Sequence, residues 1–107
     1  MNIRCNGHTV SVGGIKELDA ANATAFRDAV CATLNKNGFK DIEVDLSQTV
    51  FLDSWGLGVL VALRKTAESR NGSVRLLNPT PSVQQILELT RLHRLFDLVY
   101  EADAVAK

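Results

Sequence analysis

The sequence contains few of the residues that cross-link a protein. Its 107 residues include two cysteines, Cys5 and Cys31, which form no CxxC pair and have no histidine at metal-ligand spacing. Neither a disulfide framework nor a zinc site is therefore predicted. We expect two unpaired, buried thiols in a reducing compartment.

Excess charge and long apolar segments are also lacking. Lysine plus arginine and aspartate plus glutamate number 12 each, so the formal net charge is +0. This balance argues against nucleic acid or an anionic membrane surface as a general partner. The longest apolar run, residues 55–63, is far shorter than the roughly 20 residues of a membrane span, and the N-terminus lacks the apolar region of a signal peptide. We expect a cytoplasmic protein without membrane insertion.

Residue patterns typical of catalysis are scarce. The two histidines, His8 and His93, are far apart in the sequence and are expected at the surface. Ser54 lacks the G-x-S-x-G context of a nucleophile elbow. Gly56 and Gly58 form only a G-x-G fragment, without the third glycine or the P-loop lysine of a nucleotide site. We therefore predict no enzyme activity, no cofactor and no metal site.

The N-terminal third alternates between strand and helix patterns. Two short segments flank Asn6 and Gly7, residues that tolerate positive φ, which predicts a tight β-hairpin. A helix is expected next, with Asp19 as its N-cap and Gly38 after its end. Its apolar residues recur at helical spacing: Ala23, Phe26, Val30 and Leu34.

The remaining two thirds continue this alternation. Residues 41–46 alternate between acidic and apolar side chains, as in a strand. Residues 54–70 are too long for a strand and are expected to form a helix, whose first half is apolar on nearly every side. A second strand is expected at 73–77, then a helix with a capping box of Ser82 and Gln85. Residues 95–100 form either a last short strand or a helical turn.

This order predicts an α/β fold in one domain, residues 1–107. After the hairpin, strands alternate with helices, so the sheet should be mixed with a parallel part. The strands at 42–46 and 74–77 should be parallel neighbours joined by a right-handed crossover. In the helix between them, Leu57, Leu60 and Val61 are expected to be buried on the side that faces the sheet.

The start of that helix is its most unusual feature. Asp53 or Ser54 is expected to cap the helix, and Gly56 and Gly58 to let it pack close to the sheet. Trp55, in the first turn, either points outward as an interface residue or lies against the sheet. A helix N-terminus also favours anionic groups, and a hydroxyl there is a candidate for phosphorylation.

The sequence resembles the STAS family, the domain of bacterial anti-sigma factor antagonists. The resemblance covers nearly the whole chain, and its most specific segments are "VDLS", "FLDSWGLGVLV" and "LELTRLHRLF". It implies a four- to five-stranded, mixed and mostly parallel sheet, with helices packed chiefly on one face.

The resemblance also implies partner switching in transcription regulation. An antagonist of this type binds a kinase-like anti-sigma factor, a serine kinase-like ATPase protein, and is released when a hydroxyl at the start of the helix is phosphorylated. A PP2C-type phosphatase is then a further candidate partner. Asp19 and Asp53 match family acids near the partner surface, and the implied partner-binding residues are Asp19, Asp53, Ser54, Trp55 and Gly56.

One departure from the family pattern affects this implication. The family phosphorylates the residue directly before the glycine, and here that residue is Trp55. Ser54 remains as a candidate acceptor one position earlier. Arg91 likewise replaces a glycine that often follows the last helix. The alternative function is a constitutive small STAS subunit that binds the ATPase of a lipid-transport ABC complex and needs no phosphorylation.

Overall fold

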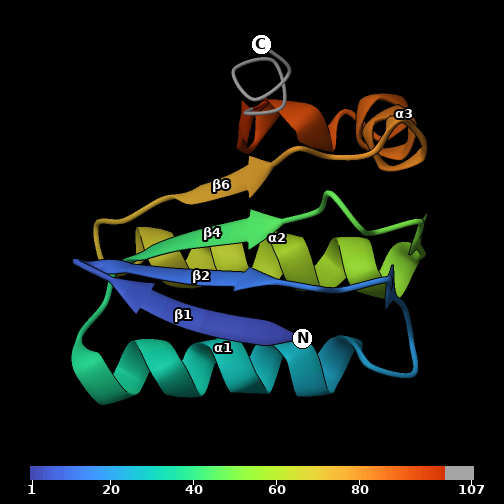
Figure 1. Ribbon diagram of the computed structural model, residues 1–107. Helices are drawn as coiled ribbons and strands as arrows, with labels where there is room; N and C mark the ends of the chain where they lie inside the picture. The colour runs from blue at the N-terminus through green and yellow to red at the C-terminus, as the bar shows by residue number, and fades with distance from the viewer. Residues whose placement is uncertain (101–107) are drawn as a thin grey trace, which may run out of the picture.

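The computed structural model of the protein describes residues 1–100, apart from the side chain of residue 37. Its main element is a five-stranded sheet in the order β1-β2-β4-β6-β7 (Figure 1). The strands are β1 (Asn2–Asn6), β2 (Thr9–Gly13), β4 (Asp41–Asp45), β6 (Val74–Leu77) and β7 (Asp97–Val99). The mixed α/β fold predicted from the sequence is confirmed.

The pairing of the strands follows from the lengths of their connections. β1 and β2 form the predicted antiparallel hairpin, with Gly7 at φ +63° in its turn. β2, β4, β6 and β7 pair in parallel, and the β4–β6 pair places Ile42 beside Val74. The predicted parallel neighbours are therefore confirmed, and the segment at 95–100 contains a short strand.

Residues 1–100 also contain three α-helices and one 3₁₀ helix. α1 (Ala23–Asn37) and α2 (Ser54–Glu68) lie side by side on one face of the sheet, and Figure 1 shows α2 passing behind β2 and β4. Both begin at the edge where the parallel strands end. α3 (Pro81–Leu89) is followed by the 3₁₀ helix η1 (Leu92–Arg94). None of these helices is long and apolar enough to cross a membrane, which holds for all of the described chain.

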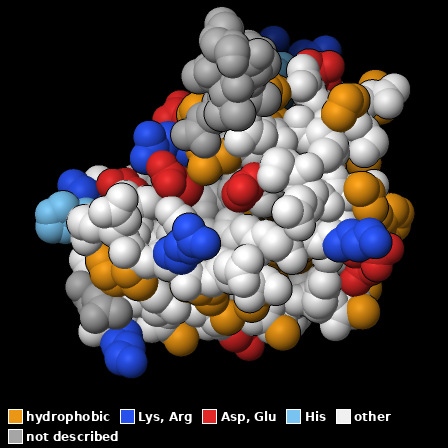
Figure 2. Space-filling model, in the orientation of Figure 1, with side chains coloured by type: hydrophobic (Ala, Val, Ile, Leu, Met, Phe, Trp, Pro, Cys, Tyr) orange, Lys and Arg blue, Asp and Glu red, His pale blue; other side chains and the backbone are white. Residues whose placement is uncertain are grey.

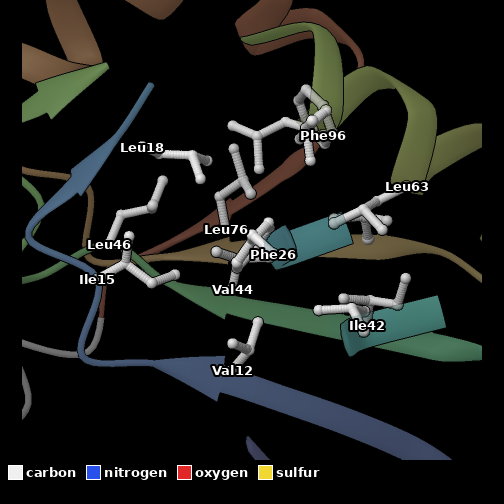
Figure 3. Close-up of a cluster of buried hydrophobic side chains, with 14 of the residues drawn as sticks. Val12, Ile15, Leu18, Phe26, Ile42, Val44, Leu46, Leu63, Leu76 and Phe96 are labelled. Carbon is white, nitrogen blue, oxygen red and sulfur yellow. The ribbon is translucent and has the colours of Figure 1, made fainter. Parts of the chain in front are cut away.

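The core lies between the sheet and the helices. Figure 3 shows Ile42, Val44 and Leu76 of the sheet beside Phe26 of α1 and Leu63 of α2. α2 contributes a stripe at helical spacing, made of Gly56, Val59, Leu60, Leu63 and Ala67.

The prediction for the buried side of α2 is right for one residue of three. Leu60 is fully buried, whereas Leu57 and Val61 are only partly buried. They form a neighbouring row, one residue further around the helix than the buried stripe. The first half of α2 is apolar on nearly every side, so the sequence alone did not show which row faces the sheet.

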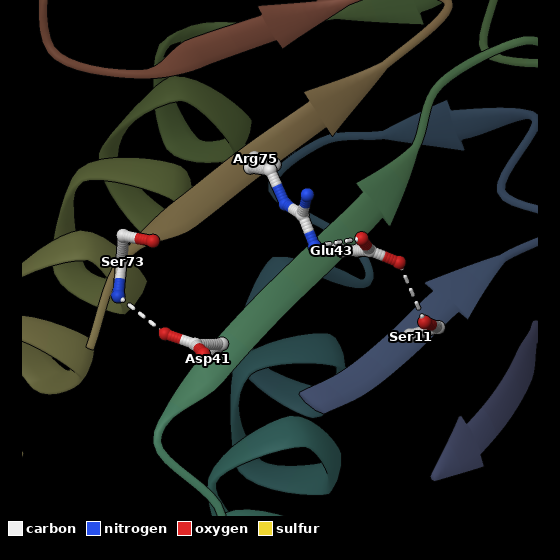
Figure 4. Close-up of polar contacts among 5 residues, drawn as sticks. All are labelled: Ser11, Asp41, Glu43, Ser73 and Arg75. Atoms are coloured by element: carbon white, nitrogen blue, oxygen red, sulfur yellow. Dashed lines mark hydrogen bonds and ion pairs between the residues drawn. The ribbon is translucent and has the colours of Figure 1, made fainter. Parts of the chain in front are cut away.

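The opposite face of the sheet carries a row of polar side chains. Residues in register across the five strands are, in order, Arg4, Ser11, Glu43, Arg75 and Asp97. The Ser11 hydroxyl donates a hydrogen bond to Glu43 Oε1 (3.0 Å), and Arg75 pairs with the other oxygen of the same carboxylate (Figure 4). Cross-strand pairs of this kind fix the register and suit a face exposed to water.

Two predicted helix caps are wrong. α1 begins at Ala23, because residues 19–22 form a turn in which the carbonyl oxygen of Asp19 accepts hydrogen bonds from Asn22 and Ala23. α3 begins at Pro81, so Ser82 lies inside the helix and makes no capping box. Proline is favoured in the first helical turn because its φ is already helical.

Three smaller expectations have mixed outcomes. Cys31 is half-buried, but Cys5, on the edge strand β1, is exposed rather than buried. His8 is at the surface as expected, whereas His93 is half-buried with Nδ1 3.3 Å from the carbonyl oxygen of Leu87. α3 ends at Leu89 even without the family glycine, since Arg91 itself takes the left-handed conformation at φ +61°.

Candidate functional site

A two-stranded parallel sheet positions the start of α2. It pairs β3 (Glu17–Leu18) with β5 (Phe51–Leu52), and the sequence analysis did not predict it. Strands of two residues carry too little periodicity to be recognised. This pairing places Asp19, which follows β3, beside Asp53, which follows β5.

Asp53 joins the two segments and caps α2. Its Oδ1 accepts a hydrogen bond from the backbone N–H of Gly56 (2.9 Å), the expected N-cap geometry. Its Oδ2 accepts a second one from the backbone N–H of Ala20 (3.1 Å). Both oxygens are thus used to hold the chain before α1 against the start of α2, and Asp53 rather than Ser54 is the cap.

Asp19 has a similar local role on its own side. Its Oδ1 accepts a hydrogen bond from the backbone N–H of Ala21 (3.0 Å), and its backbone N–H donates to Oδ1 of Asn22 (3.0 Å). These bonds shape the turn that leads into α1. The structure therefore brings Asp19 and Asp53 together, as the sequence analysis expected.

The two glycines of α2 have different surroundings. A Cβ added to Gly56 would lie 2.2 Å from the carbonyl oxygen of Leu18, so glycine is required for this close approach. Gly56 is buried, and it supports the site without contributing a side chain to its surface. A Cβ added to Gly58 would meet nothing within 4 Å. The prediction that Gly58 permits close packing on the sheet is therefore wrong.

Trp55 lies at the surface. Its side chain is 64% exposed, and Ser54 before it is exposed as well. Of the two alternatives from the sequence, the outward orientation is the one observed. Tryptophan is the side chain most enriched among the residues that dominate binding energy at protein interfaces, together with tyrosine and arginine.

Two further exposed apolar residues precede Asp53, and neither was predicted from the sequence. Val50 and Phe51 are 55% and 48% exposed. Because side chains alternate along a strand, Leu52 enters the core and Phe51 points away from it. Hydrophobic side chains gather at the right-hand edge of Figure 2, the end of the molecule where Figure 1 shows the helices beginning. The outward orientation of Phe51 could have been predicted only if β5 had been recognised as a strand.

A hollow of about 380 Å³ lies beside Trp55, between α1 and α2. Small side chains open it on the α2 side, and Arg27 of α1 borders it. It is lined by Thr24, Arg27, Ser54, Trp55, Gly58, Val59 and Ala62. Thr24 and Arg27 were not singled out from the sequence, because their role depends on how the two helices lie together.

The site offers no donor set for a metal ion. Within residues 1–100, no group of three or more histidine, cysteine, aspartate or glutamate side chains is placed to hold one. What the site presents is an apolar ring, hydroxyl groups and a guanidinium. This arrangement is suited to contact with another macromolecule.

The fluorescence of Trp55 should report on this surface directly. It is the only tryptophan in the sequence. Because the ring is largely in water, we expect acrylamide to quench the native protein nearly as efficiently as the protein unfolded in urea. Strong protection of the native indole from the quencher would contradict the exposed orientation.

Three comparisons relate this structure to known proteins. The STAS domain family matches residues 1–105. A Thermotoga maritima protein named as a candidate anti-sigma factor antagonist is 34% identical over 90 residues, which cover 81% of this chain and 80% of that protein. The anti-sigma-B factor antagonist of Bacillus subtilis is 24% identical over 98 residues, covering 92% and 88% of the two chains.

A solved structure agrees in fold over nearly the whole chain. The crystal structure of a Thermotoga maritima protein, also described as a candidate anti-sigma factor antagonist, superimposes with a TM-score of 0.85 and 29% sequence identity. The match covers 98% of this chain and 91% of that one. The chain therefore belongs to the STAS domain family and resembles its anti-sigma factor antagonists.

Proposed function

We propose that this protein is a regulatory protein-binding module that binds a kinase-like anti-sigma factor through the surface around Trp55. We call this surface, made of Asp19, Phe51, Asp53, Ser54 and Trp55, the Trp55 surface. The observation that carries the proposal is the exposed indole of Trp55 at a helix start that Asp53 holds in place. Tryptophan is enriched among the few residues that dominate binding energy.

Trp55 changes how such a complex is regulated. A kinase must bring a hydroxyl into line with the γ-phosphate of ATP, and an indole has none. Successive residues of a helix point about 100° apart, so Ser54 does not present its hydroxyl in the direction of Trp55. We propose that Trp55 is a permanent apolar anchor and that binding is regulated through the nucleotide state or the abundance of the partner.

Replacing Trp55 with alanine should weaken binding without unfolding the protein. The kinase-like anti-sigma factors of the source organism are purified and titrated calorimetrically in the presence of ADP or ATP. We expect one to bind the native protein, and Trp55→Ala to lose about 2 kcal/mol of binding free energy, or roughly 30-fold in Kd. The denaturation midpoint should change little, because the ring is 64% exposed.

A matched control uses Leu89, at the end of α3, which is 76% exposed. Leu89→Ala removes a comparably exposed apolar side chain that belongs neither to the Trp55 surface nor to the lining of the hollow beside Trp55, and this variant should bind as the native protein does. Equal losses in the two variants would contradict the assignment of the surface. Binding only to the ATPase of an ABC complex would replace this proposal with the constitutive-subunit alternative.

Phosphorylation provides an independent test of the permanent anchor. After incubation with the binding kinase and ATP, we expect mass spectrometry to find no stoichiometric phosphate on the protein. The variant Trp55→Ser, which restores a hydroxyl before Gly56, should be phosphorylated under the same conditions. A full phosphate on Ser54 of the native protein, absent in Ser54→Ala, would show instead that the switch is retained at a shifted position.

A further inference from the structure

Gly58 has no evident reason in the fold to be glycine. It lies inside α2, where glycine destabilises a helix relative to alanine because of its backbone freedom. Its φ is not in the left-handed region, and a Cβ there would meet nothing within 4 Å. Gly56, two residues earlier, has the opposite surroundings, since a Cβ there would collide with the backbone of Leu18. The missing side chain of Gly58 therefore calls for an explanation outside the fold.

The hollow beside Trp55 supplies that explanation. Gly58 and Ala62 lie one turn apart on α2, and both line the hollow of about 380 Å³ between α1 and α2. A larger side chain at either position would occupy this space. Trp55 and Ser54 line the same hollow, so it is continuous with the Trp55 surface.

Arg27 adds a charge at the border of the hollow. Its Nη2 lies 3.6 Å from Oδ1 of Asp28, the next residue, and the two side chains are 48% and 66% exposed. A long ion pair between exposed neighbours contributes little, so the guanidinium remains able to bind another carboxylate. Arginine suits this role because its planar group can donate two parallel hydrogen bonds to one carboxylate.

We propose that the hollow receives a bulky apolar side chain of the partner protein, and that an acidic residue next to it pairs with Arg27. The inference rests on the proposed function and adds to it the chemistry of the partner segment. The apolar side chain fills the space left by Gly58 and Ala62 and contacts the indole of Trp55. The acid complements the positive charge at the border and sets the direction in which the segment lies.

The test combines stability with binding. The probe is the purified kinase-like anti-sigma factor that binds the native protein in the titration above. Gly58→Ala should raise the denaturation midpoint, because alanine favours the helix, and yet raise the Kd about threefold. Gly58→Leu, which fills the hollow, should raise the Kd at least about tenfold. A residue that serves only the fold would not give a variant that is more stable and yet binds the partner more weakly.

Charge is tested separately with Arg27→Gln. This variant should raise the Kd about tenfold and make binding less sensitive to salt, because one charge pair is lost. The matched control is Arg4→Gln, which makes the same chemical change at an exposed position of β1, in the polar row on the face of the sheet opposite α1 and α2.

The outcomes separate this inference from the function on which it rests. Native binding that is weakened by Trp55→Ala but unchanged in Gly58→Leu, Gly58→Ala and Arg27→Gln would overturn the hollow and leave the proposed function intact. No binding of the native protein to any kinase-like anti-sigma factor would overturn both. If Gly58→Leu does not fold, the Kd of Gly58→Ala alone tests the inference. This variant should fold, because a Cβ at position 58 meets nothing within 4 Å.

Discussion

Truncating Leu60 to alanine should lower the free energy of unfolding by about 2–5 kcal/mol. Leu60 is fully buried in the middle of the α2 stripe that faces the sheet. Its loss removes apolar contacts and leaves a cavity that a close-packed core fills only in part. A domain of this size has a total stability of roughly 5–15 kcal/mol, so the variant should be close to the limit of folding.

Urea denaturation followed by circular dichroism measures this loss. Leu89→Ala makes the same chemical change at a position that is 76% exposed, and it should change stability by less than about 0.5 kcal/mol. If the two leucines proved equally tolerant of truncation, the buried face of α2 would have been assigned wrongly.

Replacing Gly56 with alanine should cost about 3 kcal/mol, at the upper end of the range for overpacking. The new Cβ would lie 2.2 Å from the carbonyl oxygen of Leu18 and 2.8 Å from Cδ1 of Leu52. Backbone cannot rotate away as a side chain can, so β3 or the start of α2 must move. Leu18 O also accepts the backbone N–H of Asp53 (3.3 Å), and the movement would therefore disturb the cap.

Gly58→Ala is the matched comparison for this change. The two variants add the same methyl group to the same helix two residues apart, and the signs of their effects on the denaturation midpoint should be opposite. A Gly56→Ala protein as stable as the native one would show that β3 yields easily to the start of α2.

The sequence predicted those features of the site that depend on neighbouring residues. Local evidence predicted a cap at Asp53 or Ser54, and the structure shows that Asp53 is the N-cap. Asp19 looked equally suitable, but its carbonyl and carboxyl oxygens close a turn that delays the helix to Ala23. A turn of this kind depends on backbone angles that no spacing of residue types reveals.

Features that depend on contacts between residues far apart in the sequence were harder to predict from it. The exposure of Trp55 was open to two interpretations, because it is decided by where β3 and β5 place the start of α2. The predicted capping box at Ser82 is wrong because α3 begins at Pro81, and the hydroxyl of the N-cap residue, Thr80, instead donates to the carbonyl oxygen of Thr49, 31 residues away. The parallel pairing of β4 with β6, by contrast, followed from the alternation of elements, since a strand–helix–strand unit in one sheet makes that crossover.

The parallel centre of the sheet has a consequence for how the chain folds. β2 meets β4, and β4 meets β6, through residues 32 positions apart, whereas β1 and β2 are joined by a tight turn. Bringing such distant residues together costs loop-closure entropy before their contacts can form. Chains rich in contacts of this kind therefore fold slowly for their size. A hairpin forms within microseconds. The central strands can pair only once the crossover connections that contain α1 and α2 have brought them together. The order of the strands should therefore influence the rate of folding more strongly than the length of the chain does.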